Sequence, residues 1–229
     1  MTDSEIIDRP SPNHDARPDG QEIDTLILHY TGMQSGEAAL ERMCDPEAEV
    51  SVHYCIEEDG RIFALVGEDR RAWHAGVALW QEASDINARS IGIELVNPGH
   101  EFGYRPFPTA QMAALKTLAL DILARHPIPA ARVLGHADVA PLRKQDPGEL
   151  LDWRGLAASG IGLWPEEGTA AVLESAVGQA LKRIGYGYTD EDLPAVIRAF
   201  QRHYRQSGIT GGADAETRRR LAALLALID

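Results

Sequence analysis

The sequence of 229 residues lacks two features that would each indicate a particular class of protein. No apolar run approaches the roughly 18 residues that a helix needs to cross a bilayer. An excess of basic residues is also missing, because 35 acidic and 22 basic side chains leave a formal net charge of −13. Proteins that bind nucleic acids or anionic membranes need a basic face to displace counterions, so neither partner is expected.

Cysteine is scarce, since Cys44 and Cys55 are the only two. Two thiols do not make a disulfide framework, and their spacing matches no zinc finger. We predict that Cys55 is a small core residue and Cys44 a free thiol, with a bridge between them as the alternative. The first 24 residues have neither the basic nor the apolar region of a signal peptide. The chain as written is therefore expected in the cytoplasm, and a trimmed form would allow a periplasmic or secreted location.

Apolar residues make up 44% of the chain and charged residues 25%, which is ordinary for a globular protein. The pattern divides the chain into three parts. Residues 1–22 show no apolar periodicity and are predicted to form an extended arm. Residues 23–165 form the main domain. From residue 166 the composition turns to Ala, Leu and Arg, which predicts a small C-terminal domain of three helices at about 170–184, 193–207 and 215–227.

Strands and helices alternate in the main domain, which indicates an α/β fold. Strands are expected at 23–31, 50–56, 61–66, 90–97 and 132–134, and helices at 37–43, 111–126 and 153–158. Asp59-Gly60 between two of these strands predicts a tight hairpin. The strand at 23–31 is nearly continuously apolar, which is typical of a strand covered on both faces.

The stretch 135–148 holds an imidazole at His136, an ammonium at Lys144 and a carboxylate at Asp146. Its prolines forbid a continuous helix and favour a rigid loop that folds back. A His and an Asp brought together in this way are two of the three protein ligands of a typical catalytic zinc site. The alternative is a surface loop that is merely rich in charge.

Two further residues stand out on strands. His29 lies at the carboxyl end of the strand 23–31, where α/β proteins place ligand-binding groups, and the alternative is a core histidine. Glu94 lies in the middle of the apolar strand 90–97, and an unpaired carboxylate there is costly to bury. We interpret Glu94 as a candidate catalytic carboxylate, with a salt-bridged structural residue as the alternative.

Other polar and aromatic residues are candidates for the wall of a substrate cleft. Trp73 and His74 lie in a loop-like segment beside a glycine that lets a ligand approach the backbone. Trp73 as a core anchor and His74 as a structural residue are the alternatives. We also predict substrate contacts for His53 and Asn87, and a structural role for His53 stays open.

Five motifs in this order resemble the zinc-dependent N-acetylmuramoyl-L-alanine amidases of the type-2 family. That family shares its fold with peptidoglycan recognition proteins and the phage T7 lysozyme. The resemblance covers about residues 25–165. The motifs are Leu-His-Tyr-Thr at 28–31, Val-Ser-Val-His-Tyr at 50–54, Trp-His-Ala-Gly at 73–76, Ser-Ile-Gly-Ile-Glu-Leu at 90–95, and the stretch 135–148.

The resemblance implies a mixed central sheet flanked by helices. It also implies one zinc ion per chain, bound by His29, His136 and Asp146, with Glu94 as general base and Lys144 as stabiliser of the oxyanion. The implied reaction is hydrolysis of the amide between the lactyl group of N-acetylmuramic acid, or its 1,6-anhydro form, and the L-alanine of the stem peptide. Peptidoglycan or a muropeptide is the implied substrate, and no protein partner is indicated.

The C-terminal helices resemble a peptidoglycan-binding domain at 181–186, 200–201 and 211–217, although a clear Asp-Gly-x-Phe-Gly segment is missing. Two other functions stay open. The fold also serves as a non-catalytic peptidoglycan-binding module, and a zinc peptidase acting on the stem peptide would use the same kind of site. The tail favours polymeric peptidoglycan as substrate, whereas the missing signal peptide favours recycled fragments.

Overall fold

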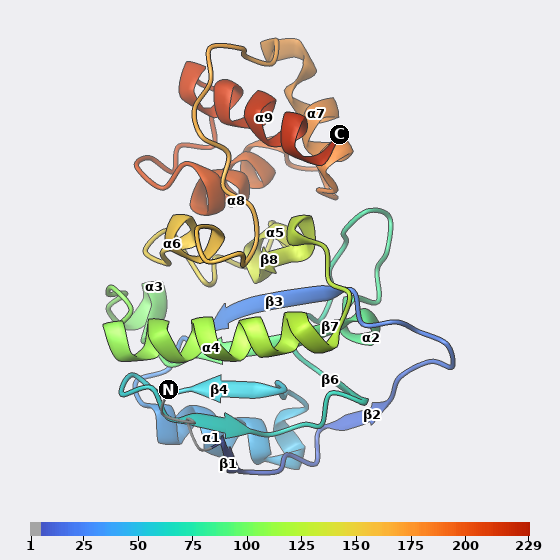
Figure 1. Cartoon of the computed structure of the whole chain (residues 1–229), viewed down its shortest axis with the longest axis vertical. Coiled ribbons are helices and arrows are strands. Elements are labelled where there is room, and N and C mark those ends of the chain that lie inside the picture. The colour runs from blue at the N-terminus through green and yellow to red at the C-terminus, as the bar shows by residue number, and fades with distance from the viewer. Residues whose placement is uncertain (1–5) are drawn as a thin grey trace.

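The computed structural model describes residues 6–229. Its strands are β1 (Ile6–Asp8), β2 (His14–Ala16), β3 (Thr25–Tyr30), β4 (Tyr54–Ile56), β5 (Ile62–Ala64), β6 (Arg70–Ala72), β7 (Ser90–Leu95) and β8 (Val133–Gly135). Six of them form one sheet in the order β1-β5-β4-β7-β3-β8, in which only β4 and β5 are antiparallel neighbours (Figure 1). The predicted α/β class with a mixed sheet is confirmed.

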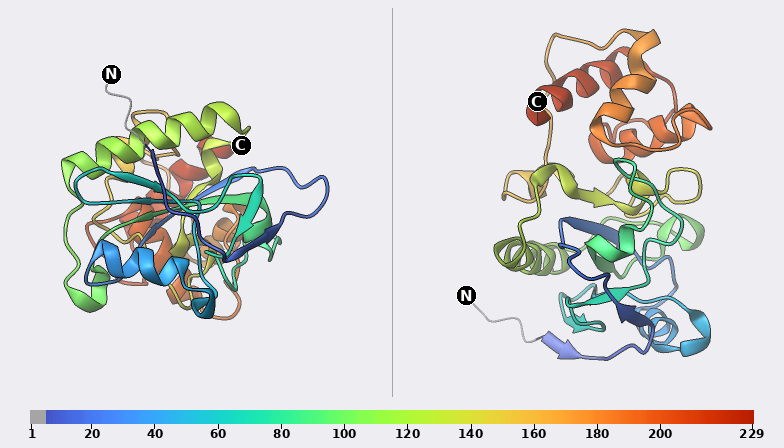
Figure 2. Two further views of the ribbon diagram at one scale, coloured as in Figure 1. Left: turned by 90° about the horizontal axis from the view of Figure 1, so that it is seen from below. Right: turned by 90° about the vertical axis from the view of Figure 1, so that its right-hand side faces the viewer.

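Helices cover this sheet on both faces and continue beyond its β8 edge. The longer ones are α1 (Gly36–Cys44), α4 (Thr109–Arg125), α7 (Val177–Ile184), α8 (Leu193–Tyr204) and α9 (Ala215–Ile228). The short ones are α2 (Ile86–Arg89), α3 (Gly99–Phe102), α5 (His136–Val139) and α6 (Trp153–Ala157), with 3-10 turns η1 (Pro46–Ala48), η2 (Ala130–Arg132) and η3 (Glu174–Ala176). Figure 2 shows α1 and α4 on opposite faces of the sheet, and α7 to α9 stacked at one end of the molecule.

Alternation along β3 and β7 decides which face of the sheet each side chain takes. Leu26 and Leu28 pack in one apolar cluster with α4, whereas Ile27 between them belongs to the cluster on the other side. His29 and Glu94 are register partners on the two parallel strands, so they share the face that points away from α4. The apolar residues of both strands thus hold two polar side chains next to one another.

Several local predictions are confirmed. The strands around Asp59-Gly60 form an antiparallel hairpin, in which Gly60 takes a positive φ of 91°. The predicted helix 111–126 is α4, and the helix 153–158 is α6. Cys44 and Cys55 are both free thiols, and Cys55 is buried. The strand expected at 50–56 is shorter, because only β4 makes ladder hydrogen bonds within it.

The predicted N-terminal arm is extended but packs on the fold; its residues 1–5 lie outside the described residues. β1 adds a parallel edge strand beside β5. β2 pairs with β6, which leads into the segment around Trp73 that was predicted to be loop-like. Arg17 is half-buried, and its guanidinium donates to the carbonyls of Ala88 and Ser90 at 2.7 and 2.8 Å. The backbone pairing of β1 and β2 leaves no periodic pattern of side chains, so the sequence did not predict these two strands.

The three C-terminal helices are present, but α7 starts at Val177 and not near residue 170. Asp214 caps α9 by accepting the Thr217 N–H at 2.9 Å. These helices do not enclose a cluster of their own: Leu181 and Phe200 belong to the same apolar cluster as Ile27 of β3 and several residues of β8 and α5. The domain limits at 22 and 165 stay predictions, and the two regions share one core.

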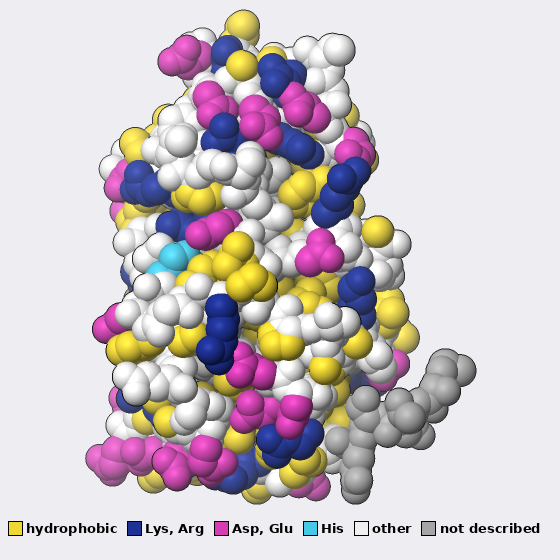
Figure 3. All heavy atoms as spheres, turned by 90° about the vertical axis from the view of Figure 1, so that its left-hand side faces the viewer, with side chains coloured by type: hydrophobic (Ala, Val, Ile, Leu, Met, Phe, Trp, Pro, Cys, Tyr) yellow, Lys and Arg dark blue, Asp and Glu magenta, His cyan; other side chains and the backbone are white. Residues whose placement is uncertain are grey.

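The charge of the surface agrees with the composition. On the face drawn in Figure 3, basic side chains are scattered among acidic ones, with no continuous basic patch. Among the described helices, none combines the length and apolar character that crossing a bilayer requires.

Candidate metal centre and catalytic groups

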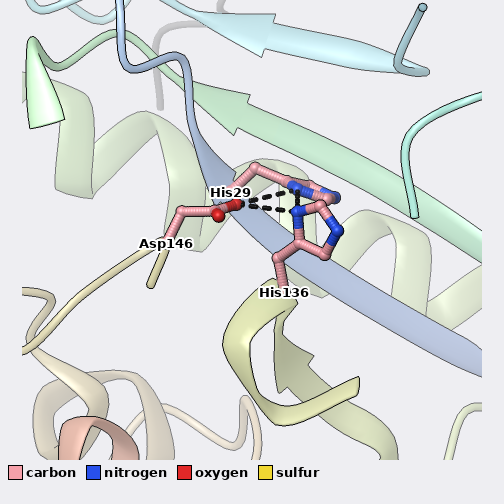
Figure 4. A group of neighbouring side chains, drawn as sticks. All are labelled: His29, His136 and Asp146. Carbon is pink, nitrogen blue, oxygen red and sulfur yellow. Dashed lines mark hydrogen bonds and ion pairs between the residues drawn. The ribbon is translucent and has the colours of Figure 1, made fainter. Parts of the chain in front are cut away.

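Three polar side chains meet at the carboxyl end of β3 (Figure 4). His29 comes from β3, His136 opens α5, and Asp146 lies on the following loop. The Nδ1 atoms of the two imidazoles are 3.0 Å apart, and Asp146 Oδ2 lies 3.1 Å from the first and 3.0 Å from the second. The residues are 1%, 3% and 6% exposed. The three candidate ligands therefore converge in a buried position.

The loop between His136 and Asp146 folds back as its prolines predict. α5 ends after a single turn, and the Lys144 N–H then donates to the Ala140 carbonyl at 3.0 Å. The Ala137 N–H donates to the Asp146 carbonyl at 2.8 Å. This backbone hydrogen bond closes the loop and holds the two ligands at a constant separation.

A chain of hydrogen bonds behind His29 decides which of its ring nitrogens carries the hydrogen. The Ser90 hydroxyl donates to the Ile86 carbonyl at 2.7 Å, so its oxygen accepts from His74 Nε2 at 3.2 Å. His74 Nδ1 is then an acceptor, and His29 Nε2 donates to it across 3.0 Å. Burial lowers the pKa of His29 to about 4, so the ring is neutral at pH 7 and Nδ1 keeps its lone pair.

The same reasoning applies to His136. Its Nε2 lies 3.0 Å from the Ala75 carbonyl oxygen, nearer than the 3.3 Å to the Arg143 guanidinium. A carbonyl only accepts, so Nε2 carries a hydrogen, and the neutral tautomer with that hydrogen presents a lone pair at Nδ1. Two imidazole lone pairs and a carboxylate thus face one another with no hydrogen among them, which repels unless a cation lies between.

These residues fit a metal ion. Two imidazole nitrogens and one carboxylate oxygen are ligands that zinc takes in catalytic sites, where a fourth position stays open. The hydrogen bonds from the far ring nitrogens, to His74 and to the Ala75 carbonyl, are those that usually orient metal-bound histidines.

Glu94 lies next to this triad, as register partner of His29. Its Oε2 is buried, and none of the described residues hydrogen-bonds it. Burial, and then the Asp146 carboxylate, raise the pKa of Glu94 well above its usual value, while the Lys144 ammonium opposes them. No Lys, Arg or His of residues 6–229 lies within 4.0 Å of the carboxylate, so the salt-bridged alternative is not found.

A cleft of about 340 Å³ opens beside Glu94, between α1 and the residues that follow β3. Its size suits part of a small ligand, and its walls are largely apolar. The lining residues other than Glu94 are Thr31, Gly32, Met33, Ala39, Arg42, Met43 and Val50.

The four predicted substrate contacts lie in different surroundings. His53 is fully buried, its Nδ1 accepts the Gly92 N–H at 3.0 Å, and burial lowers its pKa to about 3. Asn87 Oδ1 accepts the N–H groups of His74 and Ala75 at 3.1 and 2.7 Å. Asn87 thus holds the segment 74–75 behind the triad, whereas His53 is bonded to β7 and has no exposed surface for a ligand.

His74 is 7% exposed and acts through His29, as described above. Trp73 is half-buried, and the described residues offer its indole N–H no acceptor. A substrate contact for Trp73 stays a prediction, because the unpartnered indole N–H is itself buried.

Some residues of the site escaped the sequence analysis. Arg143 donates to the Val77 carbonyl at 2.8 Å and also to the Ala75 carbonyl, which ties the ligand loop to the segment after β6. Tyr104 donates its hydroxyl hydrogen to the Pro147 carbonyl at 2.7 Å. The sequence did not identify Arg143 or Tyr104 as residues of the site, because their partners are backbone carbonyls far away in the sequence.

Comparison with known proteins agrees with this geometry. A family model described as N-acetylmuramoyl-L-alanine amidase matches residues 19–149. The N-acetylmuramoyl-L-alanine amidase AmiD of Escherichia coli is 37% identical over 96% of this chain and 90% of its own. The 1,6-anhydro-N-acetylmuramyl-L-alanine amidase AmpD of Enterobacter cloacae is 34% identical over 63% of this chain and 84% of its own.

Solved structures match over nearly the whole chain. AmiD from E. coli, in complex with the substrate anhydro-N-acetylmuramic acid-L-Ala-D-gamma-Glu-L-Lys, superposes with a TM-score of 0.82 and covers 92% of each chain. AmpDh3 from Pseudomonas aeruginosa, in complex with anhydromuramic pentapeptide, gives a TM-score of 0.83 at 32% identity and covers 92% of this chain and 94% of its own. Both matches extend over the C-terminal helices as well as the sheet.

Proposed function

The chain belongs to the N-acetylmuramoyl-L-alanine amidase family, and from this membership we infer that it is a hydrolase of peptidoglycan turnover. It cleaves the amide bond between the lactyl group of N-acetylmuramic acid, in its ordinary or 1,6-anhydro form, and the L-alanine of the stem peptide. The observation that carries this function is the convergence of three buried lone pairs beside an unpaired buried carboxylate.

His29, His136 and Asp146 would hold one zinc ion per chain through Nδ1, Nδ1 and a carboxylate oxygen. Zinc supplies a nucleophile at neutral pH by lowering the pKa of bound water to about 7, and it polarises a carbonyl as a Lewis acid. Burial favours the neutral state of His29, and the hydrogen bond from its Nε2 to His74 leaves the ligand nitrogen Nδ1 unprotonated.

Glu94 is the proposed general base. Its carboxylate takes a proton from the attacking water and passes it to the alanine nitrogen, which leaves as an amine. A raised pKa suits both halves of this task, because the carboxyl then holds the proton between the two transfers. The adjoining cleft would receive the part of the substrate next to the scissile bond.

Lys144 is the proposed stabiliser of the negative charge that develops on the carbonyl oxygen. Its ammonium lowers the pKa of Glu94 electrostatically, which supports this role. One preorganised donor of this kind is typically worth about 3 kcal/mol in the transition state. A non-catalytic binding module would have no use for Glu94 and Lys144 beside three ligands, so we propose the enzyme.

We propose an anhydro-muropeptide as a substrate, because AmiD and AmpDh3 have been solved with such molecules bound. The test is a digest of purified anhydro-muropeptides beside a digest of purified sacculi, with zinc content measured and products weighed by mass spectrometry. An amidase releases an intact peptide that begins with L-alanine. Shortened peptides would instead indicate a zinc peptidase, and no product from either substrate would contradict an enzymatic function.

A further inference from the structure

A further buried carboxylate, Asp138, lies on α5 close to the ligand His136 and is bound by residues of the C-terminal region. Its Oδ2 accepts from His203 Nδ1 at 2.7 Å, and its Oδ1 accepts from the Tyr186 hydroxyl at 2.6 Å. The Gly135 N–H donates to Oδ2 as well, at 2.7 Å. Asp138, Tyr186 and His203 are each 2% exposed. The carboxylate therefore receives three donors and is shielded from water.

The packing around this cluster restrains its two donors from the C-terminal region. Burial raises the pKa of Tyr186 well above its usual value, so its hydroxyl remains a donor at neutral pH. The imidazole of His203 stacks on Trp153 and on Tyr204, with ring centroids 3.7 and 3.8 Å apart. The Tyr186 ring packs edge-to-face on Trp80, with ring centroids 4.9 Å apart, so neither donor can turn away from Asp138 without breaking its packing.

The cluster is linked directly to the backbone of the ligand His136. The residue before the ligand, Gly135, donates its N–H to the Asp138 carboxylate. The residue after it, Ala137, donates its N–H to the backbone carbonyl of Asp146. The two residues that flank His136 are thus each hydrogen-bonded, and Gly135 is bonded to the side chain that also accepts from Tyr186 and His203.

Helix α8 also contacts the far end of the ligand loop. Arg202, next to His203, donates to the Gln145 side chain at 2.9 Å, and Gln145 precedes the ligand Asp146. One helix of the C-terminal region therefore touches the loop beside both of its ligands.

We propose that Tyr186 and His203 are positioning residues for the metal centre, which through Asp138 hold His136 in the place where its Nδ1 meets the other two ligands. The proposal rests on the proposed function, since it concerns the same three ligands. It makes the C-terminal helices part of the catalytic unit, in addition to any contact they make with peptidoglycan.

The test uses the full chain with single substitutions and measures the zinc dissociation constant by competition with a chromophoric chelator. Tyr186→Phe and His203→Leu each remove one donor to Asp138 and keep an apolar body of similar size. We expect each to weaken zinc binding roughly tenfold, which is the usual cost of losing a group that orients a metal ligand. With zinc saturating, kcat on an anhydro-muropeptide should fall while KM changes little.

Two matched variants separate positioning from general destabilisation. His203→Asn keeps an N–H donor near the place of Nδ1, so it should bind zinc as the wild type does. Tyr204→Phe removes a hydroxyl from the same helix that makes no hydrogen bond within residues 6–229, and it should change nothing. Circular dichroism and thermal unfolding check folding, and Tyr186→Phe, the mildest change, remains informative even when His203→Leu fails to fold.

Two results would overturn the proposal by itself: wild-type zinc affinity in both Tyr186→Phe and His203→Leu, or an equal loss of affinity in His203→Asn and His203→Leu. The second result would assign the effect to ring packing and not to the hydrogen bond. A wild-type protein that binds no zinc would overturn the proposed function and this proposal with it, so the two failures are distinguishable.

Discussion

Asp138 and Asp146 lie in the same stretch of chain and are both nearly fully buried, yet their surroundings are opposite. Asp138 is met by three hydrogen-bond donors, from Gly135, Tyr186 and His203. Asp146 lies against the Nδ1 atoms of His29 and His136, which both present lone pairs. The hydrogens of these two rings are on Nε2, where they are donated to His74 and to the Ala75 carbonyl. The first carboxylate is satisfied by protein alone, and the second needs a cation.

The difference shows which property distinguishes a functional cluster of buried polar groups from a structural one. Burial and charge are alike at the two sites, so neither quantity identifies the functional one. The count of donors against acceptors does, because a buried acceptor that lacks a donor is costly unless something else compensates it. By the same count Glu94, with an unpaired buried oxygen, belongs with the metal site.

The largest effect is expected from Asp146→Ala. The change removes one of the three proposed protein ligands of zinc, so metal content and amidase activity should fall to background together. Chelation of the wild type should abolish activity in the same way without unfolding the chain, since the sheet has its own core. Elemental analysis, product release and circular dichroism measure these outcomes, and a fully zinc-loaded, active Asp146→Ala protein would contradict the assignment.

Glu94→Gln should keep zinc while losing turnover. The amide preserves the shape of the side chain but cannot take a proton, and the loss expected for a general base is roughly 10²- to 10⁴-fold in kcat. Glu94→Ala is the companion variant, in which shape is lost as well. Wild-type turnover by zinc-loaded Glu94→Gln would make Glu94 a structural carboxylate and move the base elsewhere.

Lys144→Ala should also keep near-stoichiometric zinc, because the ammonium is not a proposed ligand. Its loss should lower kcat by about 10²- to 10³-fold with little change in KM, since the interaction is made mainly in the transition state. Steady-state kinetics on an anhydro-muropeptide separate the two parameters. If instead KM rises and kcat is unchanged, Lys144 binds the substrate in its ground state.

The smallest effect concerns stability and compares the two carboxylates directly. In metal-free protein, Asp138→Asn should lower the free energy of unfolding by about 1–3 kcal/mol, because an amide N–H₂ then faces hydrogen-bond donors. Asp146→Asn places the same N–H₂ group among lone pairs and should leave stability unchanged or raise it. Urea titration of both proteins measures this, and equal losses would refute the donor and acceptor assignment.

Local pattern predicted much of the fold. The apolar run of β3, the hairpin at Asp59-Gly60 and the helix α4 follow from strand alternation, turn chemistry and helical periodicity, and all are present. The composition change near residue 166 predicted the C-terminal helices but suggested a separate core. Periodicity reports that a helix has an apolar face, and it does not report what that face covers, here the cluster that contains Ile27.

Residue type and position identified the candidates at the site, because His29 at a strand end, His136 and Asp146 on a prolyl loop, and Glu94 in an apolar strand each conflict with their surroundings. Only the tertiary structure decided which of their atoms face one another. Three hydrogen bonds join segments that are far apart in the sequence. They run from His29 to His74, from His136 to the Ala75 carbonyl, and from His203 of the C-terminal helices to Asp138. Such contacts depend on how chains pack in three dimensions, and hydrogen-bond partners at that distance leave no periodic trace along the chain.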